Sequence, residues 1–451
     1  MNDDGYDDLI VGALYNDWGG TDAGRAYVYS GQTGGVLWTF TGESAYDRFG
    51  YSLSGAGDVN NDGYDDLIVA APWNDAESDS AGRAYVYSGQ TGGLLWTFTG
   101  EAAGDLFGWS VSGAGDVNND GFADLIVGAP ENDGGASNAG RAYVYSGQTG
   151  GLIWTFTREA EFDHFGWSVS GAGDVDNDGY EDLIVGIPYS ALAKQPQACV
   201  YSGQTGEKLW LFTADSPGDQ FGHSVSGAGD VNNDGTPDVI VGALQLLPDP
   251  DSGQAYVYSG QTGDLLWTFT GEGVHEYFGV SVSGAGDVNK DGFDDVIVGA
   301  PCNSAGGWDA GRAYCYSGLR GGLLCTFTGD AADNHFGHSV SGAGDVNNDG
   351  FDEVIVGAPY NNAGGAGAGR AYVYACQVQE PYICGDVNGD EVINSADVVY
   401  LINYLFKGGP PPAPECVGDV NCDDVINSAD VVYLIDYLFK GGPEPGPDCC
   451  P

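Results

Sequence analysis

The sequence predicts an all-β chain, a seven-bladed β-propeller of four-stranded blades, joined to a small α-helical domain with calcium-binding loops. Three observations predict this fold. A unit of about 58 residues recurs seven times between residues 1 and 376. Each unit holds short runs rich in Val, Ile, Tyr, Phe and Trp, divided by Gly, Asn, Asp and Ser, which is typical of strands and turns. After residue 376 the repeat ends, and two copies of a polar loop with a helical pattern follow.

The pitch of the repeat is nearly constant. The aspartate before one loop glycine recurs at steps of 58, 58, 58, 56, 57 and 58 residues. Its positions are Asp4, Asp62, Asp120, Asp178, Asp234, Asp291 and Asp349. A fixed period of this length is typical of solenoids and propellers. We favour a propeller because one strand of each unit is apolar without alternation, as expected when both faces of a sheet are covered. A stacked solenoid is the alternative.

Four strands are expected in each unit, and the third unit shows them clearly. They cover residues 107–112 (strand A), 125–128 (B), 142–145 (C) and 152–156 (D). Strands B and C occur seven times, but A and D only six, because the first unit lacks A and the last lacks D. Upstream residues or a neighbouring molecule could supply the absent strands by strand addition. Without them the ring would keep exposed strand edges.

Three segments follow from the end of the repeat. We assign residues 1–376 to the propeller, 377–383 to a linker and 384–451 to the helical domain. Residues 1–5 align with residues 59–63, so the sequence opens inside a repeat. We expect the reading frame to extend upstream and to supply a signal peptide, since none is recognisable at residue 1.

Composition excludes several classes of function. Asp and Glu number 65 against 13 Lys and Arg, so the formal net charge is −52. This charge repels phosphate backbones and anionic membranes, and we expect no nucleic-acid partner. The 42% of hydrophobic residues suffices for a core, which argues against a disordered chain. No stretch approaches the length of a membrane span.

The ten cysteines favour an oxidising setting, because none forms a zinc-like pair and the number is even. We therefore expect a secreted, bacterial protein with some disulfides. For Cys199, Cys315 and Cys325 the alternative is that of small buried residues, because each replaces a Tyr, Val or Trp of the repeat.

The loop between strands A and B reads Asp-x-Asn-x-Asp-Gly-x-x-Asp. In the second unit it offers the side-chain oxygens of Asp58, Asn60, Asp62 and Asp66 and the carbonyl of Tyr64. Alternate oxygen ligands, a glycine turn and a closing carboxylate suit Ca²⁺ better than Mg²⁺, which demands stricter geometry. The equivalent groups are Asp116, Asn118, Asp120, Phe122 and Asp124; Asp174, Asp176, Asp178, Tyr180 and Asp182; Asp230, Asn232, Asp234, Thr236 and Asp238; Asp287, Asn289, Asp291, Phe293 and Asp295; and Asp345, Asn347, Asp349, Phe351 and Glu353.

The first loop is incomplete. It keeps Asn2, Asp4 and Asp8 but lacks the first ligand, so we expect six to seven calcium ions in the propeller. Pro237 and Glu353 are milder departures from the pattern. The alternative is a set of polar turns in which Asn and Asp adopt positive φ. We expect a structural role for the ions, because each ligand set lies within one loop.

The unit resembles the FG-GAP repeat of integrin α-subunit propellers. Phe107-Gly108 and Gly128-Ala129-Pro130 are the two motifs that give this repeat its name, with the calcium loop between them. The resemblance implies a seven-bladed ring with calcium on one face. It also implies that the B–C and D–A loops of the other face bind ligands.

The second module contains two near-identical segments. Each joins a loop with calcium ligands to an apolar helical pattern and a Gly-Gly-Pro stop. The ligand positions are Asp386, Asn388, Asp390, Val392 (carbonyl) and Asp397, then Asp419, Asn421, Asp423, Val425 (carbonyl) and Asp430. Loop position 6 is Glu391 and Asp424, where glycine is usual, so calcium affinity is expected to be weaker.

This pair of loop-helix segments resembles a type I dockerin. The resemblance implies up to two calcium ions and a cohesin partner, with Ser395 and Ser428 in the recognition surface. The alternative is a calcium-stapled helical pair with no cohesin partner. A segment of this size needs such staples.

No catalytic centre is expected. The five histidines lie near the Phe-Gly motifs of different blades, and no nucleophile elbow, HExxH motif or phosphate-binding glycine loop occurs. Aromatic and histidine residues of the face opposite calcium are a candidate ligand face, with blade packing as the alternative. The candidates are Trp18, Trp73, Trp109, Trp167, His223, Trp308 and His338. The tryptophan of strand D (Trp38, Trp96, Trp154, Trp210 and Trp267) is expected in the blade core.

The sequence thus predicts a secreted, calcium-binding, non-catalytic binding or structural protein that its dockerin-like module attaches to an extracellular assembly. The expected partner is a cohesin-like domain or another copy of the chain, with a glycan or cell-surface protein as the ligand of the propeller. One alternative is a homopolymer in which the dockerin-like module or an edge strand docks on the next propeller. The other is a calcium-dependent enzyme that acts on polysaccharides.

Overall fold

The computed structural model describes the chain except residues 190–194, 214–217, 245–251, 366, 377–383, 389–391, 413–414, 422–424, 444 and 446–451. It divides into two compact units, Met1–Val378 and Gln379–Pro451. The expected linker, residues 377–383, lies outside the described residues.

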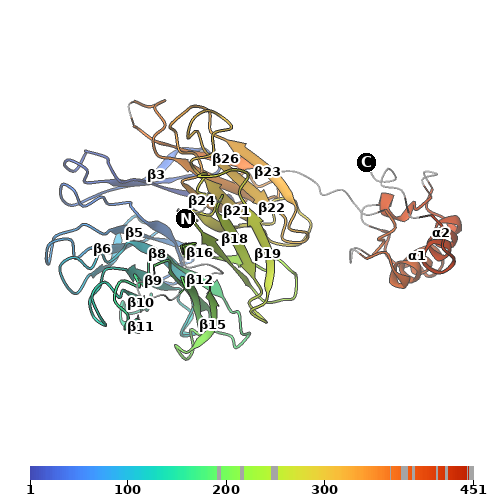
Figure 1. Ribbon diagram of the computed structural model, residues 1–451, viewed down its shortest axis with the longest axis horizontal. Helices are drawn as coiled ribbons and strands as arrows, with labels where there is room; N and C mark the ends of the chain where they lie inside the picture. The colour runs from blue at the N-terminus through green and yellow to red at the C-terminus, as the bar shows by residue number, and fades with distance from the viewer. Residues whose placement is uncertain are drawn as a thin grey trace. The chain divides into compact units, whose positions relative to one another are not determined.

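The first unit is a β-propeller of seven antiparallel sheets, which confirms the predicted fold (Figure 1). The first three blades contain β1 (Leu9–Ala13), β2 (Arg25–Tyr29) and β3 (Val36–Thr41); β4 (Leu53–Gly57), β5 (Asp66–Ala71), β6 (Arg83–Tyr87) and β7 (Leu94–Thr99); and β8 (Ser110–Gly115), β9 (Asp124–Ala129), β10 (Arg141–Tyr145) and β11 (Leu152–Thr157). The next two contain β12 (Val169–Gly173), β13 (Asp182–Ile187), β14 (Gln197–Tyr201) and β15 (Lys208–Thr213); and β16 (Phe221–Gly229), β17 (Asp238–Ala243), β18 (Gln254–Tyr258) and β19 (Leu265–Thr270). The last two contain β20 (Val282–Gly286), β21 (Asp295–Ala300), β22 (Arg312–Tyr316) and β23 (Leu323–Thr328); and β24 (Ser339–Gly344), β25 (Glu353–Ala358) and β26 (Arg370–Ala375).

The end blades have three strands each in the described residues, as the repeat count predicts. The second strand is fully buried in blades 2 to 6, but its counterpart β1 is only half-buried along its whole length. Likewise β26 is half-exposed, whereas the equivalent β22 is buried over its three central residues. The inner edge of blade 1 and the outer edge of blade 7 therefore stay unpaired among the described strands.

Inner strands of neighbouring blades pack backbone to backbone around the axis (Figure 1). The amide of Val111 donates to Ser52 Oγ at 3.0 Å, and the same bond joins four further blade pairs. A Cβ added to Gly113 would lie 2.8 Å from the carbonyl oxygen of Gly55, so this position admits only glycine. Among the described residues, no atom lies within 4 Å of such a Cβ on Gly55. In that part of the chain, no inner strand lies between β24 and β4.

The tryptophans of strand D connect neighbouring blades. The indole Nε1 of Trp38 donates to the carbonyl of Gly89 in the next blade at 3.0 Å, and Gly92 packs on its ring. The same arrangement recurs at Trp96, Trp154, Trp210 and Trp267. These side chains are half-buried and pack against the buried clusters, so the predicted packing on the core is confirmed, but the bond to the next blade was not foreseen. Their position in blade 6 is taken by Cys325.

Cys325 forms a disulfide with Cys376, which directly follows β26. This bond agrees with the expectation of some disulfides, and the alternative of a small buried residue is wrong for Cys325. Cys199 and Cys315 are buried free thiols, as that alternative holds. The substitution has a physical reason. The glycine that receives the tryptophan lies in the hairpin between strands C and D, and the described part of blade 7 has no strand D. The disulfide therefore takes the place of the tryptophan–glycine contact between blades 6 and 7.

The second unit contains helices α1 (Ser395–Lys407) and α2 (Ser428–Lys440) and a short 3₁₀ helix, η1 (Glu415–Gly418). Both helices begin with an asparagine capping box and end at a left-handed glycine, Gly408 and Gly441. Leu401 and Leu434 are fully buried between them, with Val387 and Val420 from the preceding loops. The two halves thus fold alike, as their sequences predict.

Candidate calcium sites and ligand face

The loop of blade 2 folds around its own carboxylates. Asp58 accepts hydrogen bonds from the amides of Asp62 and Gly63 at 3.0 and 2.8 Å. Asp66 is completely buried and accepts from the amides of Val59 and Gly89 at 3.1 and 2.9 Å. Because Gly89 lies in the hairpin between strands C and D, the closing aspartate also joins two loops at the same end of its blade. These bonds hold several oxygen ligands in one short loop.

Burial raises the pKa of the closing aspartates, although backbone amides oppose this shift. Repulsion from neighbouring carboxylates adds to it. The pKa of Asp66 rises to about 6, those of Asp124, Asp182 and Asp238 to about 7, and that of Asp295 to about 8. A cation between these carboxylates would favour their charged form.

The donor set fits Ca²⁺ on two observations of the structure. The buried Oδ1 atoms of Asn60 and Asn118 receive no hydrogen bond from the described residues. Each is therefore an unpaired acceptor beside the carboxylates of its own loop. In blade 4, ligand oxygens of Asp174, Asp176 and Asp182 lie within 4.8 Å of one another. Carboxylate and amide oxygens are the ligands that Ca²⁺ takes in flexible loops. The number of ions stays a prediction.

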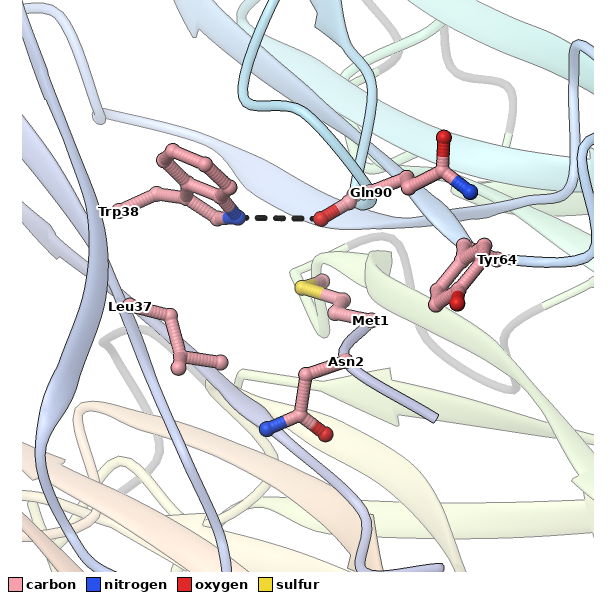
Figure 2. Close-up of a pocket in the computed structure, with 7 residues that line it drawn as sticks. Met1, Asn2, Leu37, Trp38, Tyr64 and Gln90 are labelled. Carbon is pink, nitrogen blue, oxygen red and sulfur yellow. Dashed lines mark hydrogen bonds between the residues drawn. The ribbon is translucent and has the colours of Figure 1, made fainter. Parts of the chain in front are cut away.

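The incomplete first loop lies beside a small pocket, which Figure 2 shows. Asp8 accepts from the amides of Asn2 and Gly31 at 3.1 Å. The bond from Gly31 matches that from Gly89 to Asp66 in blade 2. Met1 packs beside Gly89, where later blades place a valine beside the matching glycine. The sequence alignment of Met1 with Val59 therefore holds in three dimensions.

Two departures from the loop pattern have structural explanations. Glu353 accepts from the amide of Val346 at 3.0 Å, as shorter aspartates do in other blades, and its other oxygen accepts from Asn347. Pro237 has no amide hydrogen. Its counterparts Ala123 and Asp294 donate that hydrogen to the carbonyl of the preceding blade's loop at 3.2 and 3.3 Å. Blade 5 therefore lacks one bond between blades but keeps its ligand positions.

In the helical unit the predicted position-12 ligands have a second role. Asp397 is completely buried and accepts from the amides of Val387 and Asn394 at 2.8 Å, so it ties the loop to the start of α1. Asp430 accepts from the amide of Asn427 at 2.8 Å in the same way. Asp386 and Asp419 are buried nearby, and Val392 and Val425 are exposed. Asp390 and Asp423 lie outside the described residues.

On the opposite end of strand A, aromatic side chains meet across blades. Trp109 lies 4.9 Å from Tyr51 and 4.8 Å from Trp167, between ring centroids. Trp73 contacts Tyr51 and Trp109, at 5.0 and 5.7 Å. His223 lies 5.8 Å from Trp167, and burial lowers its pKa to about 4, so its ring is neutral. Four of the predicted ligand-face residues are therefore brought together.

Two further candidates are separate from this group in the described contacts, since Trp18 is exposed and stacks on Arg25, and Trp308 is exposed. His338 is exposed immediately before β24, and its charge adds to the lowering of the pKa of His223. Sequence reasoning also missed a contact between blades 6 and 7, where Cys302 Sγ lies 3.9 Å from His335 Nδ1. Both residues lie at loop positions that vary between the units, so the repeat alignment gives no signal for this contact.

Comparison with protein families agrees with this geometry. The FG-GAP repeat model matches residues 49–87, 107–145, 165–205 and 336–374, and the FG-GAP-like repeat model matches residues 230–298. The dockerin type I domain model matches residues 384–439. The chain belongs to the FG-GAP repeat propellers and carries a type I dockerin domain. Both resemblances drawn from the sequence are confirmed.

Curated relatives are similar to part of this chain. Chicken integrin alpha-V is 32% identical over 48% of this chain and 22% of its own length, and chicken integrin alpha-8 is 30% identical over 47% and 21%. Human phosphatidylinositol-glycan-specific phospholipase D is 30% identical over 73% of this chain and 46% of its own length. The chain therefore spans less than half of each of these relatives. In the described part of the chain, no helix has the length and apolarity to cross a membrane.

Proposed function

We propose that this chain is an extracellular, non-catalytic binding subunit, which its dockerin domain attaches to a larger assembly through a cohesin-like partner. One observation carries the docking role. Val399 and Phe406 on α1 are 54% and 66% exposed, and Val432 and Phe439 on α2 are equally exposed. Exposed apolar side chains at matched positions of two helices suit a protein interface rather than a core.

Each set lies on one helix face with an exposed serine. Ser395, Val399 and Phe406 are separated by four and seven residues, which places them on one side of a helix, and Ser428, Val432 and Phe439 repeat the pattern. Because the two faces carry the same residues, a partner that fits one face should also fit the other. The dockerin therefore offers two equivalent docking faces.

The docking role is tested by capture of the full chain on an immobilised type I cohesin in calcium. The double variant Val399→Asp, Phe406→Asp should still be captured, through the face on α2. The double variant Val432→Asp, Phe439→Asp should still be captured, through the face on α1. The four changes together should abolish capture. Full capture by the fourfold variant, or no capture of the wild type by any cohesin tested, would count against the proposal.

A non-catalytic role is supported by the chemistry of the face opposite calcium. Cys302 beside His335 is the contact there that most resembles a nucleophile with its base. Burial raises the pKa of Cys302 to about 11, and Asp309 adds to this, so the thiol keeps its proton at neutral pH. An assay for calcium-dependent release of reducing ends from polysaccharides tests the enzyme alternative.

Self-assembly is a second candidate, which the unpaired edges of β1 and β26 favour. Light scattering of the chain alone distinguishes it from cohesin docking. A monomer in calcium supports a separate partner, whereas filaments or rings would show that the chain binds itself.

A further inference from the structure

Five aromatic residues form a continuous arc across blades 2 to 4 on the face opposite calcium. Tyr51, Trp109 and Trp167 follow the Phe-Gly motif in successive blades, and Trp73 and Tyr189 come from the adjacent B–C loops. Trp73 contacts both Tyr51 and Trp109, and Tyr189 lies 5.1 Å from Trp167. We call these five residues the aromatic arc.

The fold does not require the arc. The same repeat position carries His223, Val280 and His338 in blades 5 to 7, and those blades form the same strands. The phenylalanines just before this position, such as Phe107 and Phe165, are almost completely buried, whereas Trp109 and Trp167 are only half-buried. The core is therefore complete without the arc residues. Part of their ring surface is not used in packing and stays accessible.

The arc also retains hydrogen-bond donors. Each strand-D tryptophan donates its indole Nε1 to a glycine carbonyl of the next blade. In the described part of the chain, the Nε1 groups of Trp73, Trp109 and Trp167 donate no such bond. Polar groups contact the rings, since the Arg48 guanidinium lies over the Trp73 ring at 4.3 Å from its centroid, and the His164 ring lies 5.2 Å from that of Tyr189. The surface thus combines flat apolar rings with donors at their edges.

A polyhydroxylated ligand matches this combination. Sugar rings stack their apolar C–H faces on aromatic rings and exchange hydrogen bonds at their edges. The rings follow one another over three neighbouring blades, and a surface of this extent suits an extended polymer better than a single small molecule. A net charge of −52 disfavours acidic polymers. We infer that the aromatic arc binds a neutral polysaccharide. This inference rests on the proposed binding role of the propeller, but not on its docking role.

The test is native electrophoresis of the full chain, in calcium, through gels that contain a neutral β-glucan, xylan, mannan or starch, or the acidic polymers alginate and polygalacturonate. At least one neutral polymer should retard the wild type. Trp109→Ala and Trp167→Ala should weaken binding to that polymer by about tenfold or more, equivalent to ~1.4 kcal/mol. Trp109→Phe, which keeps a ring, should retain most of the binding.

Trp308→Ala is the matched control, because Trp308 is 74% exposed on a loop of the same face but lies in blade 6 outside the arc. It should leave retardation unchanged. If Trp109→Ala fails to fold, as judged by its thermal transition, Trp73→Ala in an adjacent loop replaces it. The inference would be overturned if the arc variants were retarded like the wild type, or if Trp308→Ala lost as much binding as they do. It would also be overturned if only acidic polymers retarded the chain, or if the propeller captured a protein ligand and no glycan. Cohesin capture should be unaffected by arc variants, so failure here is separable from failure of the docking role.

Discussion

Asp7 and Asp345 are 338 residues apart in sequence, and they close the ring. The amide of Asp345 donates to Asp7 Oδ2 at 2.9 Å, and the amide of Asp7 donates to the carbonyl of Asp345 at 3.2 Å. The same pair of bonds joins Asp294 to Asp230 and Asp352 to Asp287 in neighbouring blades. Blade 1 is therefore joined to blade 7 by the same pair of loop hydrogen bonds that joins other neighbouring blades, although each end blade has three described strands.

Asp7→Ala should reduce the free energy of unfolding by about 1–3 kcal/mol, because it leaves a loop amide of blade 7 without its charged acceptor. Asp65→Ala is the matched control. Asp65 takes the same repeat position in blade 2, but its carboxylate accepts no hydrogen bond from the described residues. Urea unfolding in calcium measures both. Equal losses in the two variants would refute the role of Asp7 in ring closure.

Cys376→Ser should loosen blade 7. The disulfide with Cys325 closes a segment of 51 residues, and loss of such a bond typically costs about 2–4 kcal/mol. Hydrogen exchange in β24, β25 and β26 should accelerate, while exchange in blade 3 changes little. A reducing agent should bring the wild type to the same state without affecting the variant. Cys199→Ser, which removes a buried free thiol, is the control and should leave exchange in blade 7 unchanged.

Much of this architecture could be predicted from the sequence because the repeat is an internal alignment. The strands, the two incomplete blades and the loop ligands follow from the period and from residue types that a strand or a calcium loop requires. The duplicated dockerin halves, with their glycine stops at Gly408 and Gly441, could be predicted for the same reason.

Contacts between blades could not be predicted in this way, because a repeat pattern shows what each unit contains and not which units touch. Trp38 was assigned to a core, yet its indole bonds to the next blade. Cys325 was compared with the residue it replaces rather than with Cys376, which lies beyond the last aligned strand. The candidate ligand face separated in the same manner, since Trp109 and Trp167 lie in neighbouring blades whereas Trp18 and Trp308 do not adjoin them.

Calcium occupancy should follow the completeness of each loop. Native mass spectrometry should show that Asp62→Ala removes one ion, because Asp62 belongs to a loop with all its ligand positions. Asp4→Ala changes the matched position of the first loop, which lacks the first ligand, and should leave the count unchanged if that loop is empty. Loss of one ion in both variants would show that the first loop also binds calcium. No loss in either would contradict the assignment of these loops as calcium sites.

The open place between β24 and β4 should accept a strand in trans. A peptide with the sequence of residues 107–116 carries the serine and the glycine that neighbouring inner strands use in their contacts, and it should pair with the unpaired edge of β1. The amide of Leu53 and the hydroxyl of Ser339 occupy the positions that bond to such a strand in other blades. The peptide should raise the melting temperature of the full chain in a concentration-dependent manner. A control peptide with valine at the position of Gly113 should not, because its Cβ would meet a carbonyl oxygen of the neighbouring inner strand at about the 3 Å seen for the equivalent glycines. Equal stabilisation by both peptides would indicate nonspecific binding and contradict an ordered inner place.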